Sequence, residues 1–222
     1  MSGLAGVDGC KHGWIAAVET ERKVAIHHLT LDELFDDKQF STVVIDVPIG
    51  LPDRGRRAAD TEARKLLKRR ACCIFTAPIR PILGCNTRAE ATKVWWAIDQ
   101  KKCTCQTFAI KDKIKVVDER MTARIQTRIW EGHPEVSFTE MNKEPIEFGK
   151  KNQSGRDARL RLLEPHFPGI FQWVADNQSC ATDVIDAFAM LWTARRVGNG
   201  EAQRLPKSPE YDSRGLRMEI AY

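Results

Sequence analysis

The sequence predicts a single α/β domain in which a mixed β-sheet is flanked by helices and carries a helical insertion. Short apolar runs separated by turn residues fill the amino-terminal part, strand and helix patterns then alternate, and a long apolar helix pattern lies near the end. The 222 residues, 42% of them hydrophobic, suffice for one sizeable core but not for two full domains. We therefore expect one domain over residues 1–222, with the insertion at approximately 72–130.

Three short apolar runs at the amino terminus are typical of antiparallel strands, because turn residues separate each run from the next. The runs cover residues 4–8, 14–19 and 24–29. In the following segment, 30–37, Thr30 and Glu33 have the spacing of a capping box, which predicts a short helix.

A buried strand and a further helix continue the alternation. Residues 43–49 form a continuous apolar run of the kind found in strands that are covered on both faces. A helix is predicted over 58–70, so the expected order is βββαβα. In the segment 72–130, the patterns at 88–100 and 106–129 are helical, which predicts a helical insertion.

The carboxyl-terminal part predicts one more strand and two helices. Residues 134–138 suit a short edge-like strand, and 157–163 suit a basic amphipathic helix. In 181–196 apolar residues recur at helical spacing, Thr182 can act as the N-cap, and two arginines occupy the last turn. We expect this buried helix to end the fold.

The amino terminus and the cysteines indicate a cytoplasmic protein. No basic stretch precedes a long apolar run, and no window reaches the ~20 apolar residues of a membrane span, so we expect no membrane partner. Seven cysteines, an odd number, favour free thiols over a disulfide framework. The pairs Cys72–Cys73 and Cys103–Cys105 lack the gap of roughly two to four residues found in zinc knuckles, which argues against structural zinc.

The formal net charge of +5 is concentrated in a basic patch between Arg54 and Arg70. The patch holds eight basic side chains against Asp60 and Glu62, a local charge of +6, so the remaining residues sum to about −1. Such a patch suits the phosphates of a nucleic acid, although ordinary solvated surface charge would explain it equally well.

Acidic residues occur in three apolar elements that are far apart in the sequence. Asp8 ends the first apolar run, and Asp46 lies inside the run 43–49. An unpaired carboxylate in such a place costs several kcal/mol, so each of the two needs a cation or hydrogen bonds. Asp183 and Asp186 lie three positions apart and therefore share one face of the last helix.

Two of these acids also have simpler explanations. Asp46 precedes Pro48 and Gly50, and an aspartate at such a place can cap a turn. Asp183 lies in the first turn of its helix, where the helix dipole favours an acid. Asp186 lies deeper in the helix, so capping does not explain it.

The motifs GVDGCKHG, IDVPIGLP and DVIDAFAMLWTARR, together with the βββαβα order, resemble the ribonuclease H-like superfamily in the branch that contains Holliday-junction resolvases. More narrowly, FTAPIR, QTFAIKDKI, HPEVSF, KKNQSGRDARLRLL and GLRMEI resemble the family catalogued as domain of unknown function 429, whose members are described as predicted nucleases. The resemblance covers about residues 4–222. It implies a ribonuclease H-like mixed β-sheet flanked by helices.

The resemblance also implies one divalent-metal site, in which the catalytic acids and metal ligands are Asp8, Asp46, Asp183 and Asp186. Resolvases often carry glutamate at the second of these positions, and Asp46 is shorter by one methylene. The HPEVSF motif has no resolvase counterpart and adds Glu135 as a candidate fifth ligand and His133 as a candidate acid/base. A histidine that is merely packed or solvent-facing is the simpler explanation for His133.

Four carboxylates suit hard cations such as Mg²⁺ or Mn²⁺. Two such ions about 4 Å apart can activate a water and stabilise the leaving oxygen of a phosphodiester. The sequence therefore predicts a nuclease acting on structured nucleic acid, either DNA or RNA, and leaves the oligomeric state open, a dimer included. The candidate residues for binding substrate phosphates are Arg80, Lys150, Lys151 and Arg159.

Two other classes of function stay open. A non-catalytic nucleic-acid-binding or regulatory module could keep the same fold and acids. A nucleotide-phosphate-binding, actin-like ATPase would also begin with Asp8 and the glycines Gly9 and Gly13. Such an ATPase needs a second glycine-rich phosphate loop, and nothing after Gly84 repeats the first motif.

Overall fold

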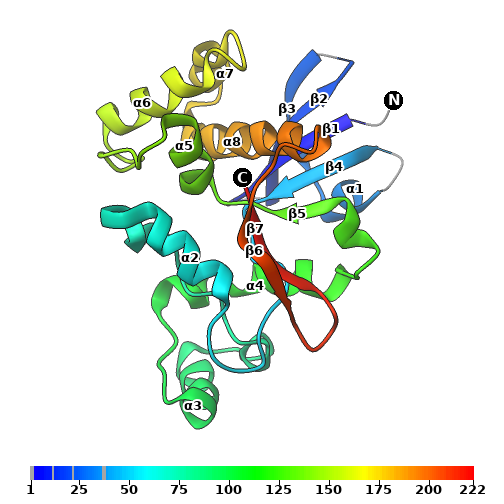
Figure 1. Ribbon diagram of the computed structural model, residues 1–222, viewed down its shortest axis with the longest axis vertical. Helices are drawn as coiled ribbons and strands as arrows, with labels where there is room; N and C mark the ends of the chain where they lie inside the picture. Colours follow the sequence, from blue (N-terminus) through cyan, green and yellow to red (C-terminus); the bar gives the residue numbers. More distant parts are fainter. Residues whose placement is uncertain (1–2, 12, 22, 37–38) are drawn as a thin grey trace.

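A five-stranded mixed sheet, in the order β3-β2-β1-β4-β5, forms the centre of the protein. The computed structural model describes residues 3–11, 13–21, 23–36 and 39–222. The strands are β1 (Gly3–Cys10), β2 (Gly13–Thr20), β3 (Lys23–Leu29), β4 (Phe40–Ile45) and β5 (Ile129–Glu131) (Figure 1). The first three are antiparallel neighbours, whereas β4 pairs parallel with β1 and β5 pairs parallel with β4. This arrangement confirms the predicted α/β class and is that expected of a ribonuclease H-like sheet.

The amino-terminal elements follow the predicted order. The short helix α1 (Leu31–Phe35) begins at the capping box, in which the Glu33 amide donates to the Thr30 hydroxyl and the Thr30 amide donates to the Glu33 carboxylate. Part of the predicted helix 30–37 lies outside the described residues. Helix α2 (Ala58–Leu67) is followed by the 3₁₀ helix η1 (Lys68–Cys73), so the helix predicted over 58–70 stops early, at a Lys68 backbone with φ of 48°.

The predicted insertion contains α-helices and 3₁₀ helices. They are η2 (Arg80–Ile82), α3 (Arg88–Asp99), α4 (Cys105–Arg120) and η3 (Ile125–Thr127). The helical pattern predicted over 106–129 is only partly right, because the chain leaves α4 after Arg120 and enters strand β5 at Ile129. Trp95 of α3 is buried with Cys85 and Cys103 in a small separate cluster, so this segment has a small apolar core of its own.

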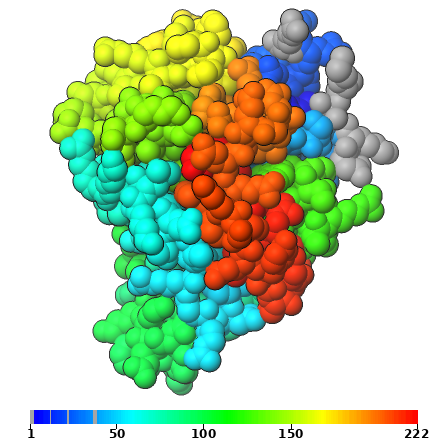
Figure 2. Space-filling view, in the orientation of Figure 1, coloured from blue at the N-terminus to red at the C-terminus, as the bar shows by residue number. Residues whose placement is uncertain are grey.

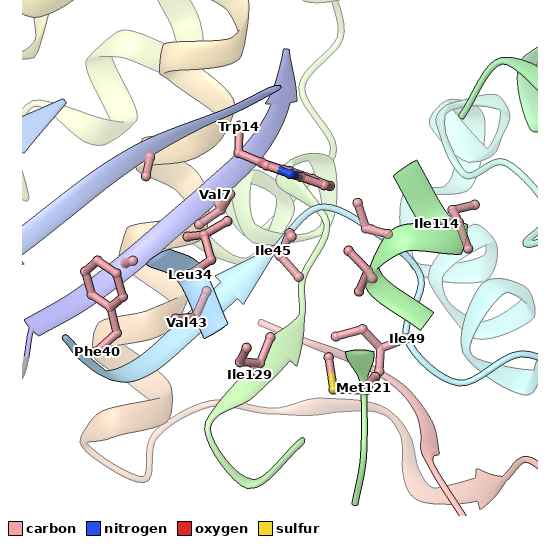
Figure 3. Packing of buried hydrophobic residues seen from close by; sticks show 14 of the residues in the cluster. Val7, Trp14, Leu34, Phe40, Val43, Ile45, Ile49, Ile114, Met121 and Ile129 are labelled. Carbon is pink, nitrogen blue, oxygen red and sulfur yellow. The ribbon is translucent and has the colours of Figure 1, made fainter. Parts of the chain in front are cut away.

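Helix α8 (Ala181–Gly198) covers one face of the sheet, and α1 and α4 lie on the other face. On the second face, Val7, Val43 and Ile45 of the sheet pack with Leu34 of α1 and Ile114 of α4 (Figure 3). On the α8 face, the helix is apolar on almost every side and is buried from Val184 to Ala194. Burial of both faces explains why 43–49 reads as one continuous apolar run.

The segment 134–138, predicted as a strand, is instead the start of helix α5 (Pro134–Asn142). Pro134 occupies the first helical turn, where its missing N–H costs nothing, and the ring of His133 accepts a hydrogen bond from the Glu135 amide at 3.2 Å. The strand in this region is β5, immediately upstream. Helices α6 (Gln153–Leu163) and α7 (Ile170–Asp176) and the 3₁₀ helix η4 (Gln178–Cys180) follow; α6 contains the predicted 157–163 segment.

The prediction that a buried helix ends the fold is wrong, because a hairpin of β6 (Arg204–Tyr211) and β7 (Arg217–Ala221) follows α8. Thr182 is also not the N-cap of α8, since the helix is capped at Cys180 without a side-chain hydrogen bond. The hairpin packs along α2 and β5 and lies on the surface beside α8 (Figures 1 and 2). All seven cysteines are free thiols, as predicted.

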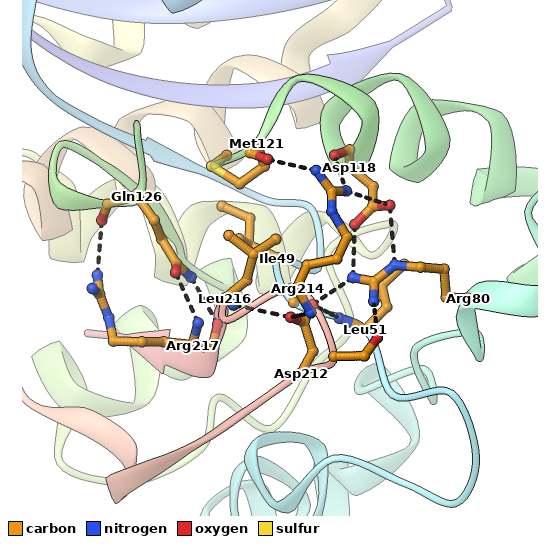
Figure 4. A network of polar contacts seen from close by, with 12 residues as sticks. Ile49, Leu51, Arg80, Asp118, Met121, Gln126, Asp212, Arg214, Leu216 and Arg217 are labelled. Atoms are coloured by element: carbon orange, nitrogen blue, oxygen red, sulfur yellow. Dashed lines mark hydrogen bonds and ion pairs between the residues drawn. The ribbon is translucent and has the colours of Figure 1, made fainter. Parts of the chain in front are cut away.

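Four charged side chains fasten the hairpin turn to the rest of the molecule. Arg80 binds Asp118 at 3.1 Å and also binds Asp212 of the turn, and Arg214 binds Asp118 at 3.0 Å (Figure 4). We call the set Arg80, Asp118, Asp212 and Arg214 the Arg80 clasp. It contains two cations and two anions, so its charges balance.

Candidate active site

The parallel register of β1 and β4 places Asp8 beside Asp46. Val7 lies opposite Ile45, and the Asp46 amide donates to the Val7 carbonyl at 3.0 Å. Val7 and Ile45 point into the cluster shared with α4, so the side chains of Asp8 and Asp46, which follow them, point to the α8 side of the sheet. Asp46 is therefore not inside a strand, as the sequence suggested, but directly after β4, at the carboxyl edge of the sheet.

A close approach between α8 and β1 brings Asp186 to the same place. A Cβ atom at Gly6 would lie 1.8 Å from the Leu191 amide nitrogen and 2.3 Å from the Ala187 carbonyl oxygen, so only glycine allows this contact. Asp186 directly precedes Ala187 and is fully buried. The apolar packing of α8 thus carries a carboxylate into the core next to the end of β1.

A lysine supplies the countercharge. The Lys150 ammonium lies 2.5 Å from Asp186 Oδ2, and its positive charge also opposes the rise in the pKa values of Asp8 and Asp46 that burial causes. Lys150 lies in the loop between α5 and α6. A Cβ at Gly155 would lie 2.2 Å from the Gly149 carbonyl oxygen, so the glycine lets α6 pack tightly on this loop. We call Asp8, Asp46, Asp186 and Lys150 the acidic centre.

The acidic centre holds more negative than positive charge. Burial raises the pKa of Asp8 well above its ordinary value, and the charges of Asp46 and Asp186 raise it further. Burial also raises the pKa of Asp46, against the charges of His133 and Lys150. Burial raises the pKa of Asp186 to about 6 despite its ion pair with Lys150. Lys150 responds in the opposite sense: burial would lower its pKa, but the nearby carboxylates raise it overall.

Asp183 lies one turn before Asp186 on α8 and is partly exposed. Burial raises its pKa, and its charge contributes to the raised pKa of Asp8. Asp8, Asp46 and Asp186 line one cavity of about 280 Å³, whereas Asp183 is absent from the described residues around it. The structure thus brings three of the four predicted acids to the cavity and leaves the fourth outside it.

The chemistry of this donor set fits a hard divalent cation. Carboxylate oxygens are the ligands that Mg²⁺ and Mn²⁺ prefer. Asp186 Oδ1 is buried and accepts no hydrogen bond within the described part of the chain, so one oxygen has no partner. As the side chains stand, however, no group of three or more His, Cys, Asp or Glu residues in the described ranges is arranged to hold a metal ion. A bound cation would therefore have to replace the Lys150 ammonium beside Asp186.

His133 and Glu135 both line the cavity. Because His133 Nδ1 accepts the Glu135 amide hydrogen, the neutral ring carries its proton on Nε2, which can donate a hydrogen bond. Both oxygens of Glu135 bind Arg159 Nη2, at 2.6 and 2.8 Å. Glu135, the candidate fifth ligand, is thus already engaged in an ion pair.

Three of the predicted phosphate-binding residues are absent from the described residues that line the cavity. Arg159 is fully buried against Glu135, so its guanidinium cannot reach a substrate phosphate, and we correct that prediction. Arg80 belongs to the Arg80 clasp (Figure 4). Lys151 is exposed on the loop beside Lys150. Lys150 lines the cavity, but as the partner of Asp186.

Sequence reasoning missed a second buried ion-pair group at the cavity wall. Arg57 lies 2.6 Å from Glu131 and 2.5 Å from Asp60, and it is 1% exposed, although the sequence placed it in the exposed basic patch. Burial raises the pKa of Glu131 to about 7 against the charge of Arg57. The spacing of Arg57 and Asp60 at i and i+3 was the available signal, but Glu131 lies far away in sequence. Arg70 and Lys113, which also line the cavity, carried no distinguishing signal.

The mixed sheet and the buried carboxylates at its carboxyl edge define an α/β protein with a ribonuclease H-like arrangement and an acidic centre. The chain belongs to the family described as "Protein of unknown function (DUF429)", whose model matches residues 6–211. Comparison with curated proteins and with solved structures returns no match. Among the described helices, none combines the length and apolarity that crossing a membrane requires.

Proposed function

We propose that the protein is a metal-dependent phosphodiesterase that cuts structured nucleic acid at the acidic centre. The observation that carries the proposal is that buried and half-buried carboxylates from β1, the end of β4 and α8 line one cavity, and that Lys150 forms an ion pair with one of them, Asp186. Keeping such an excess of buried negative charge costs stability, and sites of this kind cluster where chemistry is done.

Different residues of the site would have different roles in the reaction. Asp8, Asp46 and Asp186 would hold Mg²⁺ or Mn²⁺, with Asp183 beside them, and the bound metal would supply an activated water and stabilise the leaving oxygen. Lys150, once released from Asp186, is placed to neutralise a substrate phosphate. His133 would present Nε2–H as a hydrogen-bond donor to a substrate oxygen, because Nδ1 accepts a hydrogen bond at the start of α5.

One observation favours a second candidate function. The Lys150 ammonium already neutralises Asp186, which a protein without metal would need in order to keep the acids buried. In that case the chain is a non-catalytic nucleic-acid-binding module.

Metal binding separates the two candidates. We expect Mg²⁺ or Mn²⁺ to raise the thermal midpoint of the wild-type protein, because a ligand that binds the folded state stabilises it. Asp8→Asn should abolish most of this shift. Asp53→Asn, a charge-matched change at an exposed position, should leave it intact. An unchanged metal response in Asp8→Asn would place the ion elsewhere.

Cleavage tests the chemistry. We expect the wild type to cut one or more members of a panel of single-stranded, duplex, hybrid and branched DNA and RNA with Mg²⁺ or Mn²⁺. Asp8→Asn and Asp186→Asn should each lose about 100-fold or more, the scale seen when one electrostatic group of a catalytic centre is removed. Absence of cleavage with confirmed metal binding would favour the binding module. Full cleavage by both variants would identify a contaminating nuclease.

A further inference from the structure

The cavity at the acidic centre has a second half that the proposed chemistry does not use. Its volume of about 280 Å³ is near the lower end of small-molecule pockets, which hold roughly 300–1,000 Å³. The acids and Lys150 line one part of the wall. Much of the remaining wall comes from η1, the residues after it, and α4, and it combines Arg70 and Lys113 with apolar side chains; the buried Arg57 also lines the cavity.

Lys113 donates to the Gly13 carbonyl, so Arg70 is the cation of this second half that we consider for ligand binding. It lies on η1 and lines the cavity, and its Nε is buried without a hydrogen-bond partner among the described residues. A Cβ atom at Gly149 would lie 3.5 Å from Arg70 Nη2, so the guanidinium reaches the loop that carries Lys150. Arg70 and Lys150 therefore approach the cavity from two elements that face one another. An arginine and a lysine in this arrangement suit one phosphate group.

Apolar side chains form the wall beside Arg70. Phe75 lies on the residues after η1, lines the cavity and is 47% exposed, although large aromatic side chains are usually buried. Ile110 and Ile114 of α4 line the same cavity. An exposed aromatic ring with aliphatic neighbours is the kind of surface on which a nucleobase stacks.

We propose that the cavity binds a single unpaired nucleotide, with its phosphate between Arg70 and Lys150 and its base against Phe75 and Ile110. The cavity is of small-molecule size, so a base has to leave its duplex to enter, as it does in enzymes that extrude nucleotides. The inference rests on the proposed function in taking nucleic acid as the substrate. It narrows that substrate to strand ends, overhangs and unpaired positions.

Binding tests this independently of cleavage. With Ca²⁺ in place of Mg²⁺, we would titrate the full chain with nucleoside 5′-monophosphates, a labelled duplex with a short single-stranded overhang, and a blunt duplex of equal length. We expect the overhang to bind about tenfold more tightly than the blunt duplex, since stacking one base is worth that factor. Excess nucleoside monophosphate should displace the bound overhang duplex. If only the monophosphate binds, the occupant is a free nucleotide and the assignment of the cavity still holds.

Matched variants locate the binding. Arg70→Gln should weaken binding of both the monophosphate and the overhang about tenfold or more, the usual loss of a charged hydrogen bond. Arg69→Gln, an exposed arginine outside the cavity on the same 3₁₀ helix, should have little effect. Phe75→Ala should weaken the overhang complex, whereas Phe171→Ala, an equally exposed phenylalanine on α7, should not. Unchanged thermal midpoints would show that the variants fold.

The outcomes separate this inference from the proposed function. Suppose that the overhang binds tightly, that Arg70→Gln loses this binding, and that no substrate is cleaved. This result would support the nucleotide site and exclude the proposed phosphodiesterase activity. Equal binding of overhang and blunt duplex, with Arg70→Gln indistinguishable from Arg69→Gln, overturns the nucleotide site. If nucleic acid were cleaved although the nucleotide site is overturned, the proposed phosphodiesterase activity would still be supported.

Discussion

The acidic centre and the Arg80 clasp are both built from buried carboxylates and basic side chains, but they treat charge in opposite ways. In the clasp, two arginines face two aspartates, and all four carboxylate oxygens accept hydrogen bonds. In the acidic centre, three aspartates face one lysine, and Asp186 Oδ1 has no hydrogen-bond partner within the described residues. The first arrangement stabilises the fold, and the second costs stability.

The pKa values record the same difference. Burial would raise the pKa of Asp212, but hydrogen bonds from Arg80 and from the backbone hold it below its ordinary value. Burial dominates at Asp186 and raises its pKa. A balanced group binds its protons more weakly in the folded state, whereas an unbalanced group binds them more tightly. Complete pairing within the chain thus distinguishes the clasp from the acidic centre; under the proposed function, the incompletely paired carboxylates of the acidic centre would bind a ligand.

Breaking the clasp should have the largest effect. Asp212→Ala removes the acceptor for the Leu51, Arg214 and Leu216 amides and for Arg80, from a side chain that is 0% exposed. We expect a loss of about 3–5 kcal/mol of unfolding free energy, as for other broken buried ion pairs. Urea unfolding measures it. Ser213→Ala, in the same turn, should change stability by less than about 1 kcal/mol, and an equal loss in both variants would show that the turn, not the charge, matters.

Lowering the pH should reduce the cost of the acidic centre to the free energy of unfolding of the protein. An acid with a raised folded pKa binds protons more tightly when folded, so its unfavourable contribution is present above that pKa and disappears as the pH falls towards the unfolded value. For Asp186, the rise from 3.8 to about 6 corresponds to roughly 3 kcal/mol between about pH 7 and pH 4. Glu131 acts in the same sense. The clasp behaves oppositely: the stability from Asp212 is lost only when the pH falls below about 4.

The difference between wild type and Asp186→Asn isolates this contribution. In metal-free buffer, the unfolding free energy of the wild type should increase relative to that of the variant as the pH falls from 7 to about 5. Parallel pH profiles for the two proteins would mean that Asp186 is not the titrating group.

Removing the lysine should have the smallest effect on stability. Lys150 is 43% exposed on its side chain, so its ion pair is partly screened, but Asp186 is fully buried; Lys150→Gln should therefore cost about 1–2 kcal/mol without metal. The metal-induced rise in thermal midpoint should increase in this variant, because the ammonium no longer competes for Asp186. Lys151→Gln, the exposed neighbour, serves as the control. A smaller metal response in Lys150→Gln would show that the lysine supports the ion instead of competing with it.

Local patterns in the sequence determined much of the fold. The order βββαβα, the capping box at Thr30 and the buried helix α8 are written in short-range periodicity and capping, which act within a few residues. The same patterns predicted Asp8, Asp46 and Asp186 as candidate site residues, because a carboxylate stands out in an apolar run.

Local patterns failed where an apolar run is covered on several sides. Val136 and Phe138 are both fully buried, so alternation no longer distinguishes helix from strand, and 134–138 was misassigned. The β6–β7 hairpin was missed because its first strand is mostly exposed and contains two prolines.

The composition of the candidate site was decided by contacts between distant residues. The sequence by itself determined which acids would lie at the ends of apolar elements. Only the tertiary structure decided that Lys150 pairs with Asp186, that Arg159 forms an ion pair with Glu135, and that Arg57 is buried with Glu131. The physical reason is that a charge is satisfied by whatever lies within a few ångströms in space, and packing of α8 on the sheet and of α6 on α8 brings together residues that no local pattern relates.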